Sequence, residues 1–160
     1  IARLVGSEMC IRDRYYISLA KEEGGEILTG GTPCVPKGLS NGNWIAPTVI
    51  TGLDHNSRCS TEEIFGPVVT IHRFKSEDQA IEIANNTRYG LAGSVWTGDM
   101  EKGERVASMI HTGMIWVNTW LHRDLRVPFG GVKDSGVGRE GGRWSLGFFS
   151  EPLNVCLKND

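Results

Sequence analysis

A pair of glutamates followed by an aromatic residue is the first group of side chains that could do chemistry. Residues 62–67 read E-E-I-F-G-P, so Glu63 stands two positions before Phe65. A carboxylate can accept hydrogen bonds from both hydroxyls of a nucleotide ribose, and an aromatic ring nearby can pack beside the same ligand. The alternative is a solvated glutamate pair ahead of a strand. The pattern makes Glu63 and Phe65 candidates for binding a nucleotide cofactor.

An arginine in the loop at 118–126 is the second group. This loop reads N-T-W-L-H-R-D-L-R and precedes P-F-G-G-V-K at 128–133. The guanidinium of Arg123 could hold a carboxylate through two parallel hydrogen bonds. Its alternative is an ion pair with Asp124 or another loop carboxylate, and Arg126 reads as a structural or surface residue. Arg123 is therefore a candidate for binding a carboxylated substrate.

Three neighbours of Arg123 complete the candidate substrate site. Phe129 is expected to form a wall of the pocket, with core packing as its alternative. Asn118 ends a predicted strand, where it either orders the loop near the reaction centre or only turns the chain. Trp120 either lines the path of the substrate or is a buried tryptophan, and the sequence favours burial.

The cysteines, histidines and glycines predict no further site. The cysteines form no C-x-x-C motif and no cluster with histidine, which argues against both a disulfide framework and a metal site. The match to G-x-G-x-x-G at 136–141 follows a glycine-rich loop. A dinucleotide fingerprint needs a strand before it and a helix opening within it, so we interpret this match as accidental. The four cysteines are Cys10, Cys34, Cys59 and Cys156.

The order of these blocks resembles the C-terminal part of the NAD(P)-dependent aldehyde dehydrogenases, over residues 15–160. The resemblance implies that Glu63 binds the nicotinamide ribose of NAD and that Phe65 contacts its ring. NADP stays open, because that selectivity lies upstream. The family's nucleophilic cysteine follows a G-Q-x-C context that is absent here, and its general-base glutamate also lies upstream. We therefore expect no catalytic residue in this chain and no activity of the chain alone.

Within that family, the loop at 118–126 and S-G-V-G-R-E-G-G at 135–142 resemble the 2-aminomuconic and 2-hydroxymuconic semialdehyde dehydrogenases. This implies a small carboxylate-bearing semialdehyde, oxidised to the acid through a thiohemiacetal in the parent enzyme, with Arg123 holding the carboxylate. His122 departs from the aromatic or aliphatic residue usual there, which leaves fine selectivity open. The alternatives are another aldehyde, of the betaine aldehyde or succinic semialdehyde type, and a truncated interaction module without catalysis.

Strand and helix patterns alternate along the chain, which predicts an α/β fold of βαβ units with parallel strands. Ser76 with Gln79 forms a capping box, and Asp99 is expected to cap a second helix that ends before Gly113. The family uses its C-terminal strand in subunit pairing, so the resemblance implies a homo-oligomer. Predicted helices lie at 15–23, 76–86, 99–111 and 143–149, and predicted strands at 26–29, 68–74, 91–96, 114–118 (buried on both faces) and 153–158.

Net charge and the length of the apolar runs restrict the partners that this chain is expected to have. The 160 residues carry a net charge of −2, which gives no reason to expect nucleic acid or an anionic membrane as partner. There is no apolar run near the ~20 residues that span a bilayer, and reduced thiols favour the cytoplasm. Residues 1–14 do not continue the family pattern. We interpret them as a non-native leader or assembly artefact, with an amphipathic helix start as the alternative. Residues 15–136 then form the C-terminal part of the catalytic domain and 137–160 its tail with the oligomerisation strand.

Overall fold

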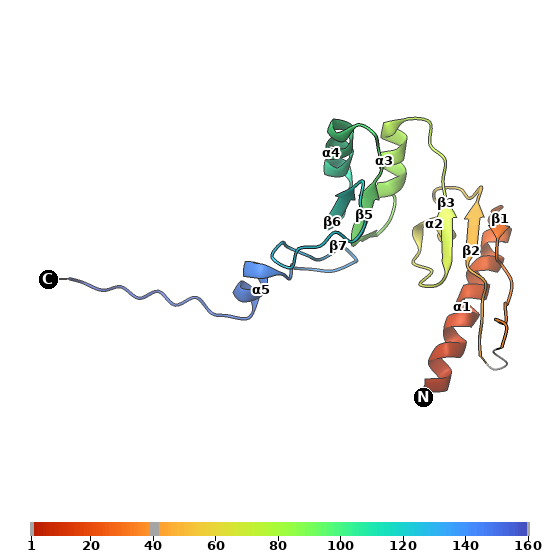
Figure 1. Ribbon diagram of the computed structural model, residues 1–160, viewed down its shortest axis with the longest axis horizontal. Coiled ribbons are helices and arrows are strands. Elements are labelled where there is room, and N and C mark those ends of the chain that lie inside the picture. Colours follow the sequence, from red (N-terminus) through yellow and green to blue (C-terminus); the bar gives the residue numbers. More distant parts are fainter. Residues whose placement is uncertain (1, 39–41, 160) are drawn as a thin grey trace. The chain divides into compact units, whose positions relative to one another are not determined.

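The computed structural model describes residues 2–38 and 42–159, with side chains from residue 8 onward, as two compact units that meet between Thr87 and Arg88. The elements of each unit are labelled in Figure 1. The first unit contains α1 (Ala2–Glu22), β1 (Glu26–Thr29), β2 (Thr48–Thr51), α2 (Arg58–Thr61), β3 (Val68–Ile71) and α3 (Glu77–Asn85). The second contains β4 (Tyr89–Gly90), β5 (Ala92–Val95), α4 (Met100–Met109), β6 (Met114–Val117), β7 (Val132–Lys133) and α5 (Gly142–Phe148).

The first unit is a three-stranded sheet in the order β1-β2-β3, with α1 against it. β2 pairs with β1 antiparallel and with β3 parallel. Ala20 of α1 and Ile50 of β2 are fully buried together, and Leu53 and Cys59 complete this core. The β2–β3 pair confirms the parallel strands that the sequence predicts.

A glycine pair ends α1 and a serine cap begins α3, as the sequence predicts. α1 stops at a glycine pair: Gly24 has a φ of 84°, and a Cβ on Gly25 would lie 2.8 Å from the carbonyl oxygen of Ala20. Ser76 Oγ accepts the backbone N–H of Gln79, as the capping-box prediction requires. The return bond differs, because Gln79 Oε1 accepts the N–H of Lys75 and not that of Ser76.

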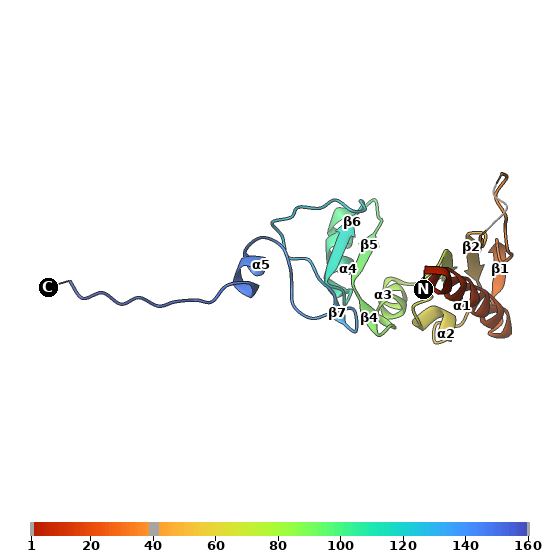
Figure 2. The ribbon, with the colours of Figure 1, turned by 90° about the horizontal axis from the view of Figure 1, so that it is seen from below.

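The second unit is a βαβ unit with short additions. β5 and β6 pair in parallel, and α4 packs on both of them (Figures 1 and 2). Asp99 Oδ1 accepts the N–H of Lys102, which confirms the predicted cap. α4 ends at Met109, so the prediction that Gly113 follows the helix directly is wrong. Gly113 is instead required by packing, because a Cβ there would overlap the carbonyl oxygen of Gly130.

Two predictions of burial and strand content fail in this unit. β6 is apolar, but only its Trp116 is buried, so it is not covered on both faces. α5 confirms the short helix predicted at 143–149. The strand predicted at 153–158 is wrong for this chain: residues 149–159 form an extended segment without helix or strand (Figure 2). A ladder requires a neighbouring strand, and none of the described strands pairs with this segment.

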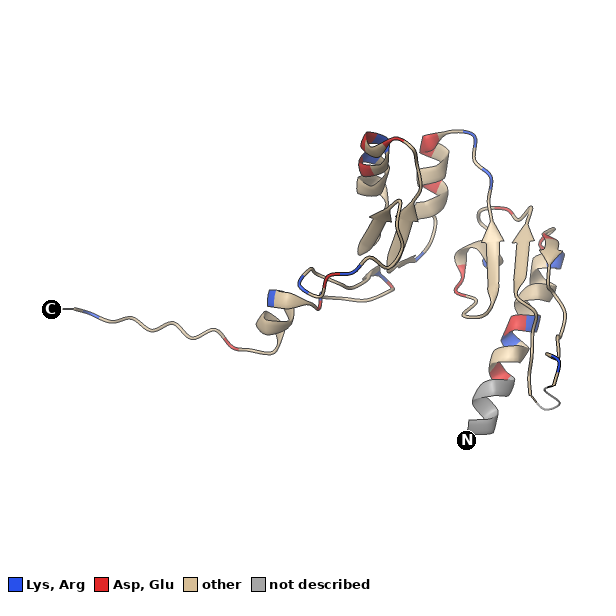
Figure 3. Ribbon diagram, viewed as in Figure 1, with Lys and Arg blue, Asp and Glu red and all other residues tan. Residues whose placement is uncertain are grey.

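Charged residues are sparse on the strands. Figure 3 shows most of the charged residues on helices and loops, and strands β2, β3, β5 and β6 carry none. No helix in the described part of the chain is long and apolar enough to cross a bilayer. α1 begins at Ala2. The division of the chain at residues 14 and 136 stays a prediction.

Candidate active-site segments

The segment at 62–65 alternates between anchored and exposed side chains. Glu62 is tied back to α1, Glu63 is exposed, Ile64 is 8% exposed and Phe65 is 64% exposed. The backbone at Glu62 is extended (φ −96°, ψ 150°), and successive side chains of an extended chain point to opposite sides. The two residues predicted to contact a cofactor are therefore the two that this segment leaves open.

Phe65 adopts a backbone conformation that residues other than glycine rarely take. Its φ is 56°, a left-handed value that costs a bulky residue free energy and persists only where its surroundings impose it. Arg12 Nη2 donates to the Phe65 carbonyl oxygen at 2.6 Å, and the guanidinium lies 5.4 Å from the ring centroid. Strain of this kind is often found at ligand sites, which supports Phe65 as a candidate.

Glu63 differs from its neighbour Glu62 in the hydrogen bonds that its carboxylate makes. Arg58, on the preceding helical turn, donates from Nε and Nη2 to the two oxygens of Glu62 at 2.8 and 2.9 Å. Tyr16 donates its hydroxyl to Glu62 at 2.8 Å. Across the residues that the structure describes, nothing comparable engages Glu63. Glu63 is therefore the carboxylate of the pair that is open to a ligand.

Arg123 and Phe129 are brought together in the second unit. The guanidinium carbon of Arg123 lies 4.2 Å from the Phe129 ring centroid, within the range of a cation–π contact. Arg123 Nη2 also lies 3.2 Å from Glu140 Oε1. The ion pair with a loop carboxylate that the sequence left as an alternative is therefore present. Asp124 is not that partner, because it binds Arg126 at 2.6 Å, and this hydrogen bond lowers the pKa of Asp124.

These residues border a pocket of about 210 Å³. Phe129 and Glu140 are held as its wall by two backbone hydrogen bonds between them, at 2.9 and 2.8 Å. Phe129 is half-buried, which fits a wall residue as well as a packing residue. The pocket is lined by Met114, His122, Arg123, Asp124, Leu125, Val127, Phe129, Glu140, Gly141 and Ser145.

Asn118 and Trp120 lie on the loop that follows β6. The amide of Asn118 donates to the Thr97 carbonyl at 2.7 Å and accepts its N–H at 2.8 Å, so it extends the β5–β6 pairing by side-chain bonds. Asn118 thus orders the start of the loop. Trp120 is 58% exposed, with its ring edge-on to Trp116 at 4.9 Å. The favoured prediction that Trp120 is buried is wrong, because Trp116 occupies the interior position.

The four cysteines differ in their exposure. All four are free thiols. Cys59 is 3% exposed and donates to the Tyr16 carbonyl, and burial raises its pKa to about 12. Because the thiolate is the reactive form, Cys59 is a packing residue.

Two histidines lie together, which the sequence did not predict. His55 and His72 lie with their Nδ1 atoms 3.3 Å apart at the ends of two parallel strands. Among the described residues, no three His, Cys, Asp or Glu side chains gather as a metal site would require. The structure also agrees that 136–141 is not a dinucleotide fingerprint, because the two-residue β7 ends at Lys133 and α5 begins only at Gly142.

Residues 7–155 match the sequence model of the aldehyde dehydrogenase family, and the chain belongs to that family. The 2-aminomuconic 6-semialdehyde dehydrogenase of a Pseudomonas species is 49% identical over 91% of this chain. The 2-hydroxymuconic semialdehyde dehydrogenase of Pseudomonas putida is 49% identical over 89%. The chain spans 30% of the length of each of these relatives.

Solved structures agree with this placement. Betaine aldehyde dehydrogenase from Staphylococcus aureus, crystallised with NAD⁺, superposes with a TM-score of 0.84 at 40% identity. The match covers 89% of this chain and 28% of that one. The α/β fold with parallel strands is thereby confirmed, and family members bind NAD.

Proposed function

We propose that this chain is the C-terminal part of an NAD-dependent dehydrogenase that oxidises a carboxylate-bearing semialdehyde of the 2-aminomuconic or 2-hydroxymuconic type. The observation that carries the proposal is the Arg123 guanidinium, which lies over Phe129 at the border of the pocket. Arg123 uses Nη2 toward Glu140, and among the described residues its other N–H groups remain to donate to a carboxylate. The names of the two Pseudomonas relatives support the same substrate class.

NAD, when bound, would supply the hydride acceptor for oxidation of the aldehyde. The exposed carboxylate of Glu63 suits the two ribose hydroxyls, and the exposed Phe65 ring suits the face of a flat heterocycle. The described residues fit that role because both side chains are open on a segment whose alternate residues are anchored. Asn118 and Trp120 contribute by shaping the loop that carries Arg123.

The bond-making residues of the reaction belong to the remainder of the proposed enzyme. A thiolate there adds to the aldehyde carbon to give a thiohemiacetal, hydride leaves, and an activated water releases the acid and restores the thiol. Cys59 does not supply this thiolate, because its pKa is raised and it is buried. The chain by itself therefore binds and orients, and we expect it to show no aldehyde oxidation. The working form is expected to be a cytoplasmic homo-oligomer.

Substitution of Arg123 in the full-length enzyme tests the proposal. Arg123→Ala should raise KM for a carboxylated semialdehyde about tenfold or more, because one charge-assisted contact contributes about 1.5–3 kcal/mol. KM for an uncharged aldehyde should stay within about twofold. Arg88→Ala is the control, since this arginine of the same unit pairs with Asp134 and neither residue lines the pocket. Equal losses for both substrates would contradict the assignment.

A second substrate class has one observation in its favour. Glu140 and Asp124 also line the pocket, and Glu140 is the carboxylate that Arg123 contacts. If Arg123 remained paired with Glu140 during catalysis, a cationic substrate such as betaine aldehyde would find a more favourable pocket than an anion would. A preference of the enzyme for betaine aldehyde would select this alternative.

A further inference from the structure

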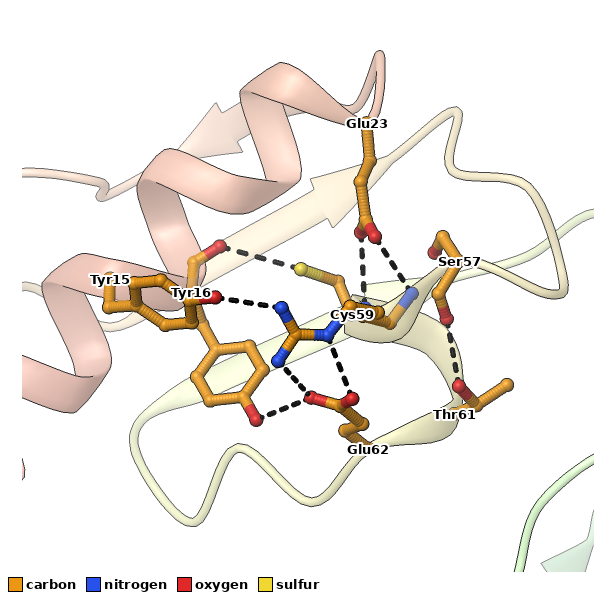
Figure 4. Close-up of polar contacts among 8 residues, drawn as sticks. Tyr15, Tyr16, Glu23, Ser57, Cys59, Thr61 and Glu62 are labelled. Atoms are coloured by element: carbon orange, nitrogen blue, oxygen red, sulfur yellow. Dashed lines mark hydrogen bonds and ion pairs between the residues drawn. The ribbon is translucent and has the colours of Figure 1, made fainter.

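Residues outside the E-E-I-F-G-P motif hold it in place. We infer that Arg58, Glu62 and Tyr16 form a clamp that positions Glu63 and Phe65 for the cofactor; the inference rests on the proposed function of those two residues. Figure 4 shows the clamp, in which side chains from the end of α1 converge on the short helix α2 and on Glu62.

The clamp begins with a helix cap supplied from elsewhere in the chain. Ser57, the N-cap residue of α2, makes no side-chain capping bond. Glu23, just beyond α1, accepts the N–H of Arg58 at 2.8 Å and that of Cys59 at 3.1 Å. Partial burial raises the pKa of Glu23, but these two N–H donors outweigh it and leave the pKa lowered. The capped end of α2 is thus fixed to the end of α1.

Arg58 connects the fixed helix α2 to Glu62, the first residue of the E-E-I-F-G-P motif. Its guanidinium forks onto both oxygens of Glu62 and also donates to the Tyr15 hydroxyl at 2.8 Å. The Glu62 carboxylate receives a third donor from Tyr16, whose pKa is raised by burial and by this bond to Glu62. A carboxylate with three donors from two helices has little freedom to rotate. Arg58 and Glu62 are about half and one-third exposed, so the clamp contributes geometry more than stability.

The clamp sets the direction of the next residues. Glu62 is the residue at which α2 ends, and its backbone is already extended. With Glu62 held inward and Ile64 buried, Glu63 is directed outward. Loosening Glu62 would let the segment rotate and disorder the Glu63 carboxylate, without touching the cofactor directly. Arg58, Glu62 and Tyr16 are therefore positioning residues.

Kinetics of the full-length enzyme separate positioning from plain stability. Arg58→Met should raise KM for NAD about tenfold and leave KM for the aldehyde unchanged, and Tyr16→Phe should act in the same direction more weakly. Glu22→Gln, exposed on the adjacent turn of α1, is the matched control and should match the wild type. In a Glu63→Ala background, Arg58→Met should add nothing, because its effect passes through Glu63.

The outcomes distinguish this inference from the proposed function. A fall in kcat or in melting temperature with an unchanged KM for NAD would overturn the positioning role, as would a full effect of Arg58→Met in the Glu63→Ala background. If Glu63→Ala itself leaves KM for NAD unchanged, the cofactor role of Glu63 fails, and the inference fails with it. In the 160-residue chain, Arg58→Met should speed amide exchange at residues 62–66 about tenfold; unchanged exchange would also overturn the clamp.

Discussion

Single residues carry the chemistry that this chain can contribute, and their freedom matters as much as their type. Glu62 and Glu63 are identical in sequence terms, yet one is held by three donors and the other is exposed. The sequence predicts Glu63 through the motif, but it does not reveal the anchoring of Glu62. That anchoring depends on Tyr16, which is 46 residues away along the chain. Only the i,i+4 spacing of Arg58 and Glu62 on a helix could have signalled part of it.

Cys59 should be the least reactive thiol of the chain. Burial raises its pKa to about 12, so almost none of it is thiolate at neutral pH, whereas Cys34 and Cys156 are exposed. A chromogenic disulfide reagent at pH 8 should label the two exposed cysteines quickly and Cys59 only after denaturation. Cys59→Ala is the control that identifies the slow phase. Rapid labelling of Cys59 in the folded chain would contradict its place in the core.

His72 should make the first unit less stable in mild acid. Desolvation and the adjacent His55 lower the pKa of His72 below its ordinary value of 6.5. The unfolded chain therefore binds the proton more tightly, and the stabilisation is present above pH 6.5 and is lost as the pH falls below it. Thermal unfolding between pH 7.5 and 5.5 should show a steeper decline for the wild type than for His72→Gln. Parallel curves would contradict the paired geometry.

At the scale of elements, most helices and several strands could be predicted from signals that lie within a few residues of each other. The caps at Ser76 and Asp99 and the glycine stop after α1 act within a few residues, so the sequence displays them directly. Strand ends were less predictable: β3 stops at Ile71, three residues before the predicted Phe74. The ends of strands depend on partners, and partner choice is a long-range property. The same reason explains why 153–158, which alternates as a strand does, forms none here.

One buried side chain in α1 should destabilise the chain. Asp13 is 3% exposed, and its Oδ1 finds no partner among the described residues. A buried acceptor without a partner costs about 1–3 kcal/mol, and alanine also favours the helix. Asp13→Ala should therefore raise the free energy of unfolding, measured by urea denaturation. Asp13→Asn, which stays polar, should gain less, and a loss of stability with Asp13→Ala would show that the carboxylate has a favourable role.

At the scale of the whole molecule, the residues proposed to bind the cofactor and the substrate are divided between the two units. Glu63 and Phe65 lie in the first unit, and Arg123 and Phe129 lie in the second. The alternation of strand and helix patterns predicted an α/β fold and the motifs predicted the family, and both are confirmed. The roles of individual side chains remained beyond sequence reasoning, because they depend on which charges pair. Arg123 illustrates this: its partner is Glu140, 17 residues on, and not the adjacent Asp124.

The exposed apolar residues also belong to this scale. Val69 and Ile71 of β3 are 54% and 46% exposed, and β3 is an edge of its sheet. Phe149, Leu153 and Leu157 are each more than 80% exposed on the C-terminal segment. Apolar surface of this extent is typical of chain that packs against further protein. The proposed enzyme, with the remainder of its sequence and its other subunits, offers such partners.

The most direct test of the central claim is the substrate preference of the full-length enzyme. kcat/KM is to be measured with NAD for 2-hydroxymuconic semialdehyde and for betaine aldehyde, by following the formation of NADH. We predict that the carboxylated semialdehyde is preferred by about tenfold or more, a difference of about 1.4 kcal/mol in transition-state binding. A preference for betaine aldehyde, or none, would contradict the role assigned to Arg123.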